Sequence, residues 1–249
     1  MRKEPESTSE MVNQVLFGEI FTVLEENKAS NFSLICLQHD KYEGWIDSRC
    51  INFLSEKDRE MVMHTSFLVS HEVITLLDGS SDENAIIIGC GSILRRSSHD
   101  TTRAYGKEFK LPEIPVNDPG KIRENLVKYG LNVVSVPYLW GGRSSFGFDC
   151  SGLCQNLYRQ VDIEIPRDAS VQAEVGHSIS FISDAKPGDL AFFDNEEGKI
   201  IHVGMILGEG KILHASGRVK IDEIDHQGIF SKEQNRYTHS LRLIKKVVV

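Results

Sequence analysis

The sequence of 249 residues has no long hydrophobic run, and stretches such as AIII at 85–88 are far too short to span a bilayer. The first ten residues, MRKEPESTSE, are charged and polar, so we expect no signal peptide. There is no stripe of Lys and Arg, and the formal net charge is −8. This charge argues against nucleic acid and anionic membranes as partners.

Cysteine is scarce, because the chain has only five such residues and no pair has CxxC spacing. A disulfide framework is not expected at this length, which favours a reducing compartment and a cytoplasmic location. The composition is 40% hydrophobic and 26% charged, which excludes disordered and coiled-coil proteins. Most of the cysteines are therefore expected to be buried thiols.

Three kinds of patterning follow each other along the chain. Short alternating runs at 8–56, and again at 60–112, predict small antiparallel barrels. Prolines concentrated at 111–120 indicate a linker. Beyond it, a helix at 118–131 and a second helix near Cys150 precede several strands, which predicts an α+β domain.

Two of these strands, KIIHVGMIL and KILHASG, are separated by residues 208–210 alone. If those three residues form the hairpin loop, Leu207 faces Lys211 and Gly204 faces His214. Because side chains alternate with period two, His202 and Gly204 share a face. His202 and His214 then become diagonal neighbours, roughly 7–8 Å apart at the backbone.

This pair of histidines suggests nucleophilic catalysis once Cys150 is added. Cys150 is predicted in or just before the first turn of a helix, where unpaired N–H groups and the macrodipole favour a thiolate. One histidine could take the thiol proton while the other holds its tautomer, and Gly204 leaves room for the second ring.

Two other interpretations stay open on these residues alone. His202 and His214 could be half-buried strand residues that hydrogen-bond to the backbone. Cys150 and Cys154 have a C-x3-C spacing that a zinc site could use, but eleven residues separate the histidines, unlike the close pair of a zinc finger. We therefore predict no metal and no cofactor, and place Cys154 in the core.

Five motifs occur in order up to the C-terminal strands: YLWGGRSSFGFDCSGL, IPRDAS, KPGDLAFFD, HVGMIL and ILHASG. Together they resemble the NlpC/p60 family of papain-like cysteine peptidases. The resemblance implies that Cys150 is the nucleophile, that His202 is the general base and that His214 orients it. It also implies that Tyr138 supplies its hydroxyl near the oxyanion.

The segments SEMVNQVLFGE and YEGWID resemble the first bacterial SH3-like domain of the gamma-D-glutamyl-L-diamino-acid endopeptidases in this family. The resemblance implies a papain-like α+β catalytic domain at 113–249. Two small all-β SH3-like barrels are expected before it, at 8–58 and at 59–112.

The same resemblance implies a substrate and its pocket. The substrate is a peptidoglycan stem peptide, cut between the γ-carboxyl of D-Glu and the diamino acid, with release of L-Ala-D-Glu. Asp149, Ser151, Glu10 and Tyr42 are implied to bind the free amine of L-Ala. Asp168 is expected to line the groove toward the D-Glu carboxylate or to organise its loop.

A carboxylate at Asp149 should disfavour the neighbouring thiolate of Cys150. Two like charges about 4 Å apart repel by roughly 4 kcal/mol at an effective dielectric near 20. A bound substrate amine would cancel this repulsion and couple recognition to activation. Alternatively, Asp149 acts only as the N-cap of the helix.

These expectations point to a monomeric enzyme that recycles small imported muropeptides in the cytoplasm. A secreted hydrolase of intact peptidoglycan is an alternative. An amidase or acyltransferase on the same scaffold would share Cys150 and His202 without needing Glu10 or Asp149. A non-catalytic peptide-binding module is a further alternative.

Overall fold

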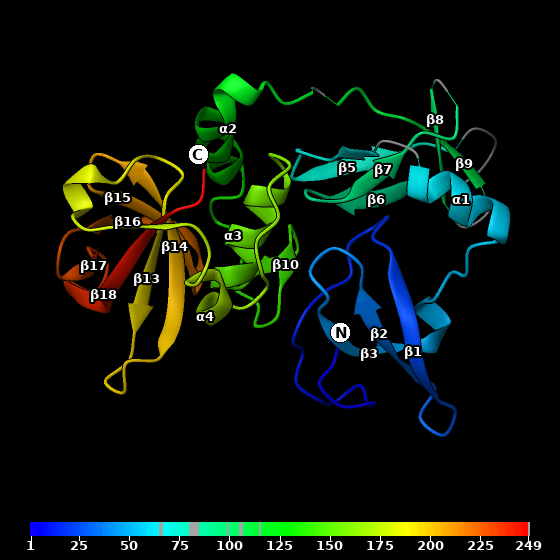
Figure 1. The fold of residues 1–249 in the computed structure, drawn as a ribbon, viewed down its shortest axis with the longest axis horizontal. Helices are drawn as coiled ribbons and strands as arrows, with labels where there is room; N and C mark the ends of the chain where they lie inside the picture. Colours follow the sequence, from blue (N-terminus) through cyan, green and yellow to red (C-terminus); the bar gives the residue numbers. More distant parts are fainter. Residues whose placement is uncertain (65–66, 80–84, 99, 105–106, 115, 249) are drawn as a thin grey trace. The chain divides into compact units, whose positions relative to one another are not determined.

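Figure 1 shows the computed structural model of the chain, which describes residues 1–64, 67–79, 85–98, 100–104, 107–114 and 116–248. The chain forms two compact units, Met1–Val116 and Asn117–Val249. Within the described ranges, no helix has both the length and the apolar character needed to cross a membrane.

The first unit is built from short antiparallel strands. Its one three-stranded sheet among the described residues joins β1 (Phe21–Asn27), β2 (Phe32–Leu37) and β3 (Glu43–Asp47). Three strand pairs follow, β4 (Phe67–Val69) with β7 (Ile93–Arg95), β5 (Ile74–Leu77) with β6 (Ile86–Gly89), and β8 (Thr101–Ala104) with β9 (Lys107–Lys110). The 3-10 helix η1 (Ser48–Cys50) and the helix α1 (Glu56–His64) connect the sheet to these pairs.

The core of this unit lies among the strand pairs. Leu77 and Leu94 are fully buried, and Phe17 from the N-terminal segment packs on the same cluster. The backbone N–H of Ile93 donates to the Phe17 carbonyl at 2.8 Å, which ties the segment before β1 to β7. The predicted boundary between residues 58 and 59 falls inside α1.

The second unit is an antiparallel barrel with helices packed against it. The strands are β12 (His177–Ile179), β13 (Leu190–Asp194), β14 (Ile200–Gly208), β15 (Lys211–Ser216), β16 (Arg218–Ile224), β17 (Gly228–Ser231) and β18 (Arg236–Lys246), in the order β12-β18-β13-β14-β15-β16-β17. Because β17 also pairs with β18, the six strands from β13 to β18 form a closed barrel. The strand β12 pairs with β18 outside this ring. Isoleucine and phenylalanine side chains fill the closed part, among them Phe193, Ile212 and Ile229.

The helical layer precedes and covers the barrel. It contains η2 (Pro119–Lys121), α2 (Ile122–Asn132), α3 (Cys150–Arg159), α4 (Ala169–Gln172) and η3 (Ile182–Asp184), with the short strands β10 (Arg143–Ser144) and β11 (Gly147–Phe148) before α3. Asp118 caps the first turn of η2 and Pro119 occupies its first position. The helix α3 packs against β14 and β15, the two strands that carry the predicted histidines (Figure 1).

The β14–β15 hairpin has the predicted register at the two histidines. Its turn differs from the predicted one. Gly204 pairs with His214 as expected. The predicted pairing of Leu207 with Lys211 is wrong, because Gly208 pairs with Lys211 and the strand bulges before it. The turn therefore has two residues rather than three, and the bulge restores the predicted register.

Candidate active site

Cys150 begins helix α3 and lies where the sequence placed it. Asp149 is the N-cap and accepts a hydrogen bond from the Gly152 N–H at 2.6 Å. The thiol is buried, and the backbone N–H groups of Val203 and Ser151 hydrogen-bond to its sulfur. Since Val203 follows His202 on β14, the sulfur lies beside the strand that carries the predicted base.

The thiol of Cys150 is protonated at neutral pH. Burial and, to a smaller extent, the negative charge of Asp149 raise the pKa of Cys150 to about 11. The N–H groups of Val203 and Ser151, and the Arg167 guanidinium, act in the opposite direction without cancelling it. The cysteine therefore needs a base to remove its proton during attack.

A chain of hydrogen bonds begins at His202 and ends at an ion pair. His202 Nε2 lies 2.9 Å from His214 Nδ1, and His214 Nε2 lies 3.1 Å from Asp222 Oδ2. Lys220 Nζ lies 3.0 Å from the same carboxylate oxygen. His214 pairs directly with Lys220 across β15 and β16, so these side chains share one face of the sheet.

The ionisation of Asp222 sets the tautomer of each ring in the chain. Burial raises the pKa of Asp222, but hydrogen bonds from His214 and Lys220 outweigh it and the pKa is lowered. The carboxylate therefore accepts the proton of His214 Nε2, which leaves Nδ1 of that ring as an acceptor. His202 donates its Nε2 proton there, and its Nδ1 lone pair remains as the base.

His202 is neutral in the resting site. Burial lowers its pKa well below 6.5, and the neighbouring His239, His214 and Lys220 lower it further. Burial also lowers the pKa of His214, against the opposing effect of Asp222. The site thus pairs a neutral thiol with a neutral imidazole.

The side chain of His214 requires a glycine at position 204. A Cβ atom at Gly204 would lie 2.9 Å from the His214 Cβ and 2.8 Å from Ile212 Cδ1. Both distances are below ordinary contact, so the absence of a side chain gives the His214 ring its room. This confirms the predicted reason for the glycine.

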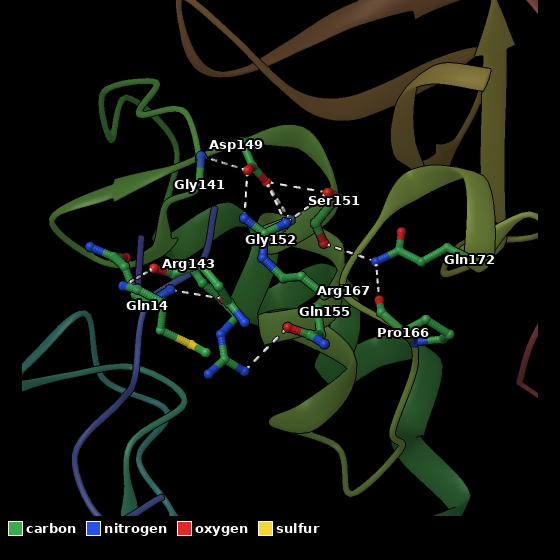
Figure 2. A network of polar contacts seen from close by, with 12 residues as sticks. Gln14, Gly141, Arg143, Asp149, Ser151, Gly152, Gln155, Pro166, Arg167 and Gln172 are labelled. Carbon is green, nitrogen blue, oxygen red and sulfur yellow. Dashed lines mark hydrogen bonds and ion pairs between the residues drawn. The ribbon is translucent and has the colours of Figure 1, made fainter. Parts of the chain in front are cut away.

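The Asp149 carboxylate is the centre of a buried polar network (Figure 2). Arg167 binds it through both terminal nitrogens, with Nη1 3.0 Å from Oδ1 and Nη2 2.5 Å from Oδ2. The Gly141 N–H donates to Oδ2 at 2.9 Å and the Ser151 hydroxyl to Oδ1 at 3.3 Å. With the Gly152 bond these make five donors on a group that has about four lone-pair directions.

Arg167 therefore supplies the positive charge that the sequence analysis assigned to a substrate amine. Its guanidinium also donates to the Ser151 hydroxyl at 2.8 Å, so both motif residues flanking Cys150 are tied to it. Gln172 on α4 donates to the carbonyls of Ser151 and Pro166 (Figure 2). These two bonds hold the segment with Pro166 and Arg167 against α3.

Tyr138 belongs to the same site. Burial, with a smaller contribution from the charges of Cys150 and Asp149, raises the pKa of its hydroxyl to about 12, so the phenol lies within electrostatic range of the nucleophile. The hydroxyl is therefore protonated at neutral pH and able to donate. Its role toward the oxyanion stays a prediction.

The other predicted pocket residues lie on other elements. Asp168 is the N-cap residue of α4, where its backbone carbonyl accepts from the Val171 and Gln172 N–H groups. Glu10 and Tyr42 belong to the first unit, where Glu10 lies 3.6 Å from Lys3 and Tyr42 precedes β3. The predicted substrate contacts of all three stay predictions.

Three residues of the site were not anticipated. Asp222 lies two residues after Lys220 on β16, and the alternation of that strand could have pointed to it. Arg167 lies within the motif IPRDAS, where nothing in the sequence marks it as the partner of Asp149. His239 lies on β18, which no pattern had indicated, and its ring stacks on His202.

Comparison with known proteins agrees with this geometry. Residues 135–239 match the NlpC/P60 family, and residues 1–50 match the bacterial dipeptidyl-peptidase Sh3 domain. The gamma-D-glutamyl-L-lysine dipeptidyl-peptidase of Bacillus subtilis is 32% identical over 225 residues, covering 85% of this chain and 74% of that protein. The chain belongs to the NlpC/P60 family.

Two further NlpC/P60 relatives extend over most of the chain. Dipeptidyl-peptidase 6 of Lysinibacillus sphaericus is 27% identical over 246 residues, with 90% of this chain and 88% of that protein covered. A crystal structure of an NlpC/P60 family protein from Bacillus cereus superposes with a TM-score of 0.79 at 20% identity, covering 95% of this chain and 82% of that one. The predicted papain-like fold and N-terminal SH3-like domain are confirmed, and the protein is a cysteine peptidase of this family.

Proposed function

We propose that the protein cuts the bond between the γ-carboxyl of D-Glu and the diamino acid in peptidoglycan stem peptides, releasing L-Ala-D-Glu. The observation that carries the proposal is the extent of the similarity to an enzyme named gamma-D-glutamyl-L-lysine dipeptidyl-peptidase. That similarity covers 85% of the chain and so reaches well beyond the unit Asn117–Val249 that holds the nucleophile.

Attack begins with proton transfer from Cys150 to Nδ1 of His202, while the sulfur adds to the γ-carbonyl carbon. The imidazolium of His202 then shares positive charge through Nε2 with His214, whose far nitrogen faces the Asp222 carboxylate. Nearby negative charge stabilises the positive charge that develops on the imidazoles. The relay therefore favours proton transfer to His202, although burial lowers the pKa of this histidine.

The carbonyl oxygen becomes an oxyanion in the tetrahedral intermediate. The protonated hydroxyl of Tyr138 and the Cys150 backbone N–H, at the start of α3, are the donors we assign to it. Collapse of the intermediate expels the amine of the diamino acid, which takes the proton from His202. Water then attacks the thioester, gives a proton to His202, and releases the γ-carboxyl with the free thiol.

The free amine of L-Ala is the second element of the proposal. Asp149 already carries five donors, so a bound amine would have to displace one of them. We therefore give Asp149 and Ser151 the role of fixing Cys150, and keep amine binding by Glu10 and Tyr42 as an expectation from the family resemblance. Coupling between amine binding and nucleophile activation is expected to be weak, since Arg167 already offsets the charge of Asp149.

The cellular role we propose is recycling of small muropeptides in the cytoplasm. It is supported by the formal net charge of −8 and by free thiols at all five cysteines. A peptide freed from the glycan carries the unblocked amine that this role requires.

A digest with matched peptides tests the proposal. We expect wild-type enzyme to release L-Ala-D-Glu from L-Ala-γ-D-Glu-L-Lys or its meso-diaminopimelate analogue, read by mass spectrometry. The α-linked isomer should stay intact, and Cys150→Ala should cut neither. The N-muramyl peptide should be cut poorly. Equal cutting of free and blocked peptides would remove the amine requirement, and no cutting of either would favour an acyltransferase or a binding module.

Glu10→Gln, compared with Glu4→Gln on the same N-terminal segment, separates the amine pocket from the chemistry. We expect Glu10→Gln to raise KM for the free peptide and to leave the rate of Cys150 alkylation unchanged. An unchanged KM would contradict the assigned role of Glu10.

A further inference from the structure

A third histidine covers the general base. His239, on β18, stacks on His202 with ring centroids 4.1 Å apart and an interplanar angle of 22°. His214 meets the same ring edge-on at 5.1 Å, and Phe193 lies 5.8 Å away at a tilt. The Thr238 hydroxyl lies 2.9 Å from His239 Nδ1 and fixes the third ring.

The three histidines lie close enough to suggest a metal site, since one nitrogen of each falls within 4.8 Å of the others. The directions of their ring nitrogens, however, do not fit a metal site. His202 Nε2 and His214 Nδ1 point at each other across a 2.9 Å hydrogen bond, so neither is aimed at a common third point. The nearly parallel rings of His202 and His239 direct their in-plane lone pairs side by side, whereas zinc needs nitrogens converging at about 2.0–2.1 Å.

We propose that His239 is a positioning residue for the general base, because its ring fixes the plane of the His202 imidazole and keeps water from that face. The inference rests on the proposed function only in taking His202 as the base. An imidazole held by one hydrogen bond at Nε2 can still rotate about that bond, and a stacked ring removes this freedom. Nδ1, the nitrogen that this hydrogen bond leaves free, then keeps one direction.

The stacked ring must be uncharged to serve this purpose. Burial, with smaller contributions from His214 and Lys220 and against the opposing effect of Asp222, lowers the pKa of His239 to about 4. His239 is therefore neutral near pH 7 and does not repel the imidazolium that forms on His202. A permanent cation at this position would oppose every proton transfer.

The charged and titratable groups around His202 come from each neighbouring element. They are His214 on β15, Lys220 and Asp222 on β16, and His239 on β18. Cys150 at the start of α3 accepts from the N–H of Val203, the neighbour of His202 on β14, and the charged or titratable groups around that thiol are Asp149, Arg167 and Tyr138. Phe193 on β13 adds an apolar ring. Lys220 is paired with Asp222, so burial under His239 and Phe193 dominates the state of His202.

The sign of the pH effect follows from this burial. His202 must be neutral to accept the thiol proton, so the rate falls as pH drops through its pKa. In the wild type that fall lies well below pH 6.5. Removing the His239 ring admits water, raises the pKa of His202 toward its ordinary value of about 6.5, and moves the acidic limb upward.

The test compares His239→Ala and His239→Gln, which lack a ring, with His239→Phe, which keeps one that cannot be protonated. His177→Ala, an exposed histidine on β12, is the matched control. The rate of Cys150 alkylation by iodoacetamide is measured across pH for each protein. Since this reaction needs no peptide, its outcome is separate from whether the proposed substrate is cut.

We expect both ring-less variants to lose about tenfold in the plateau rate, with an acidic limb displaced upward by about one pH unit, which is a tenfold change in proton affinity. His239→Phe should keep the plateau within about threefold and the limb close to that of wild type. Two ring-less variants keep the test valid should one fail to fold, as judged by thermal unfolding.

Three results would overturn the inference. One is a profile for the ring-less variants that matches His177→Ala. Another is an equal loss in His239→Phe and His239→Ala. The third is one equivalent of zinc bound by wild type and lost in His239→Phe, with alkylation restored by a chelator, which would make the cluster a metal site.

Discussion

The Nε2 atom of His214 lies 3.1 Å from a carboxylate oxygen of Asp222, and this contact decides which nitrogen of His202 acts as the base. An ionised Asp222 accepts a proton from His214, so His214 must accept one from His202. The tautomers of both histidines are thus fixed by Asp222, at the end of the hydrogen-bond chain opposite His202.

Replacing Asp222 by Asn should therefore lower kcat with little change in KM. The amide can present N–H groups to His214 Nε2, which favours the wrong tautomer and removes the negative charge near the imidazolium. We expect a loss of about 100-fold, the lower end of what general acid–base catalysis contributes.

Asp225→Asn is the control for this prediction, because Asp225 accepts from the Tyr237 hydroxyl at 2.6 Å near the end of β16. It should leave kcat unchanged. Equal kcat values for the two variants, measured on the same peptide, would remove Asp222 from the relay.

Arg167→Met should destabilise the fold. It leaves the buried Asp149 carboxylate without its ion pair, and breaking a buried pair from one side costs about 3–5 kcal/mol. The double variant with Asp149→Asn should recover part of this loss, because no buried charge remains unpaired. Urea unfolding measures both, and a double variant no more stable than Arg167→Met would contradict the pairing.

The pH dependence of the thiol is a further prediction. With the pKa of Cys150 raised to about 11 and that of His202 lowered well below 6.5, no thiolate–imidazolium pair is present at neutral pH. The difference in ultraviolet absorbance between wild type and Cys150→Ala should show no thiolate there, and thiolate should appear only as pH approaches 11. Thiolate absorbance at pH 6 would show a preformed ion pair instead.

Tyr138→Phe tests the oxyanion contact. Removal of one such donor costs about 100- to 1,000-fold in kcat. Tyr237→Phe, an exposed tyrosine, should have no effect on kcat. If Tyr138→Phe changes only KM, the hydroxyl contacts the substrate without stabilising the transition state.

Much of the catalytic unit could be predicted from the sequence, because its signals are local. The alternation of β14 and β15 with Gly204 opposite His214 placed the histidines correctly, even though the turn had two residues and not three. The bulge at the end of β14 compensated for that error. Asp118 with Pro119, and Asp149 before Cys150, are likewise local capping signals.

Two of the three residues that escaped prediction, Arg167 and His239, depend on contacts distant in sequence. Arg167 reaches Asp149 across eighteen positions, and His239 reaches His202 through the closure of β18 onto β13. No period in the sequence marks such pairings. The charge of Asp149 therefore has a partner that the sequence did not reveal, and its coupling to a substrate amine stays a prediction.

Hydroxylamine trapping tests the central claim, that Cys150 forms a thioester with the γ-carboxyl of D-Glu. The enzyme would digest L-Ala-γ-D-Glu-L-Lys with increasing hydroxylamine, and mass spectrometry would follow the products. The account predicts a γ-hydroxamate of L-Ala-D-Glu that grows at the expense of the free acid, and none with Cys150→Ala. Release of lysine by the wild type without any hydroxamate, or by Cys150→Ala, would contradict it.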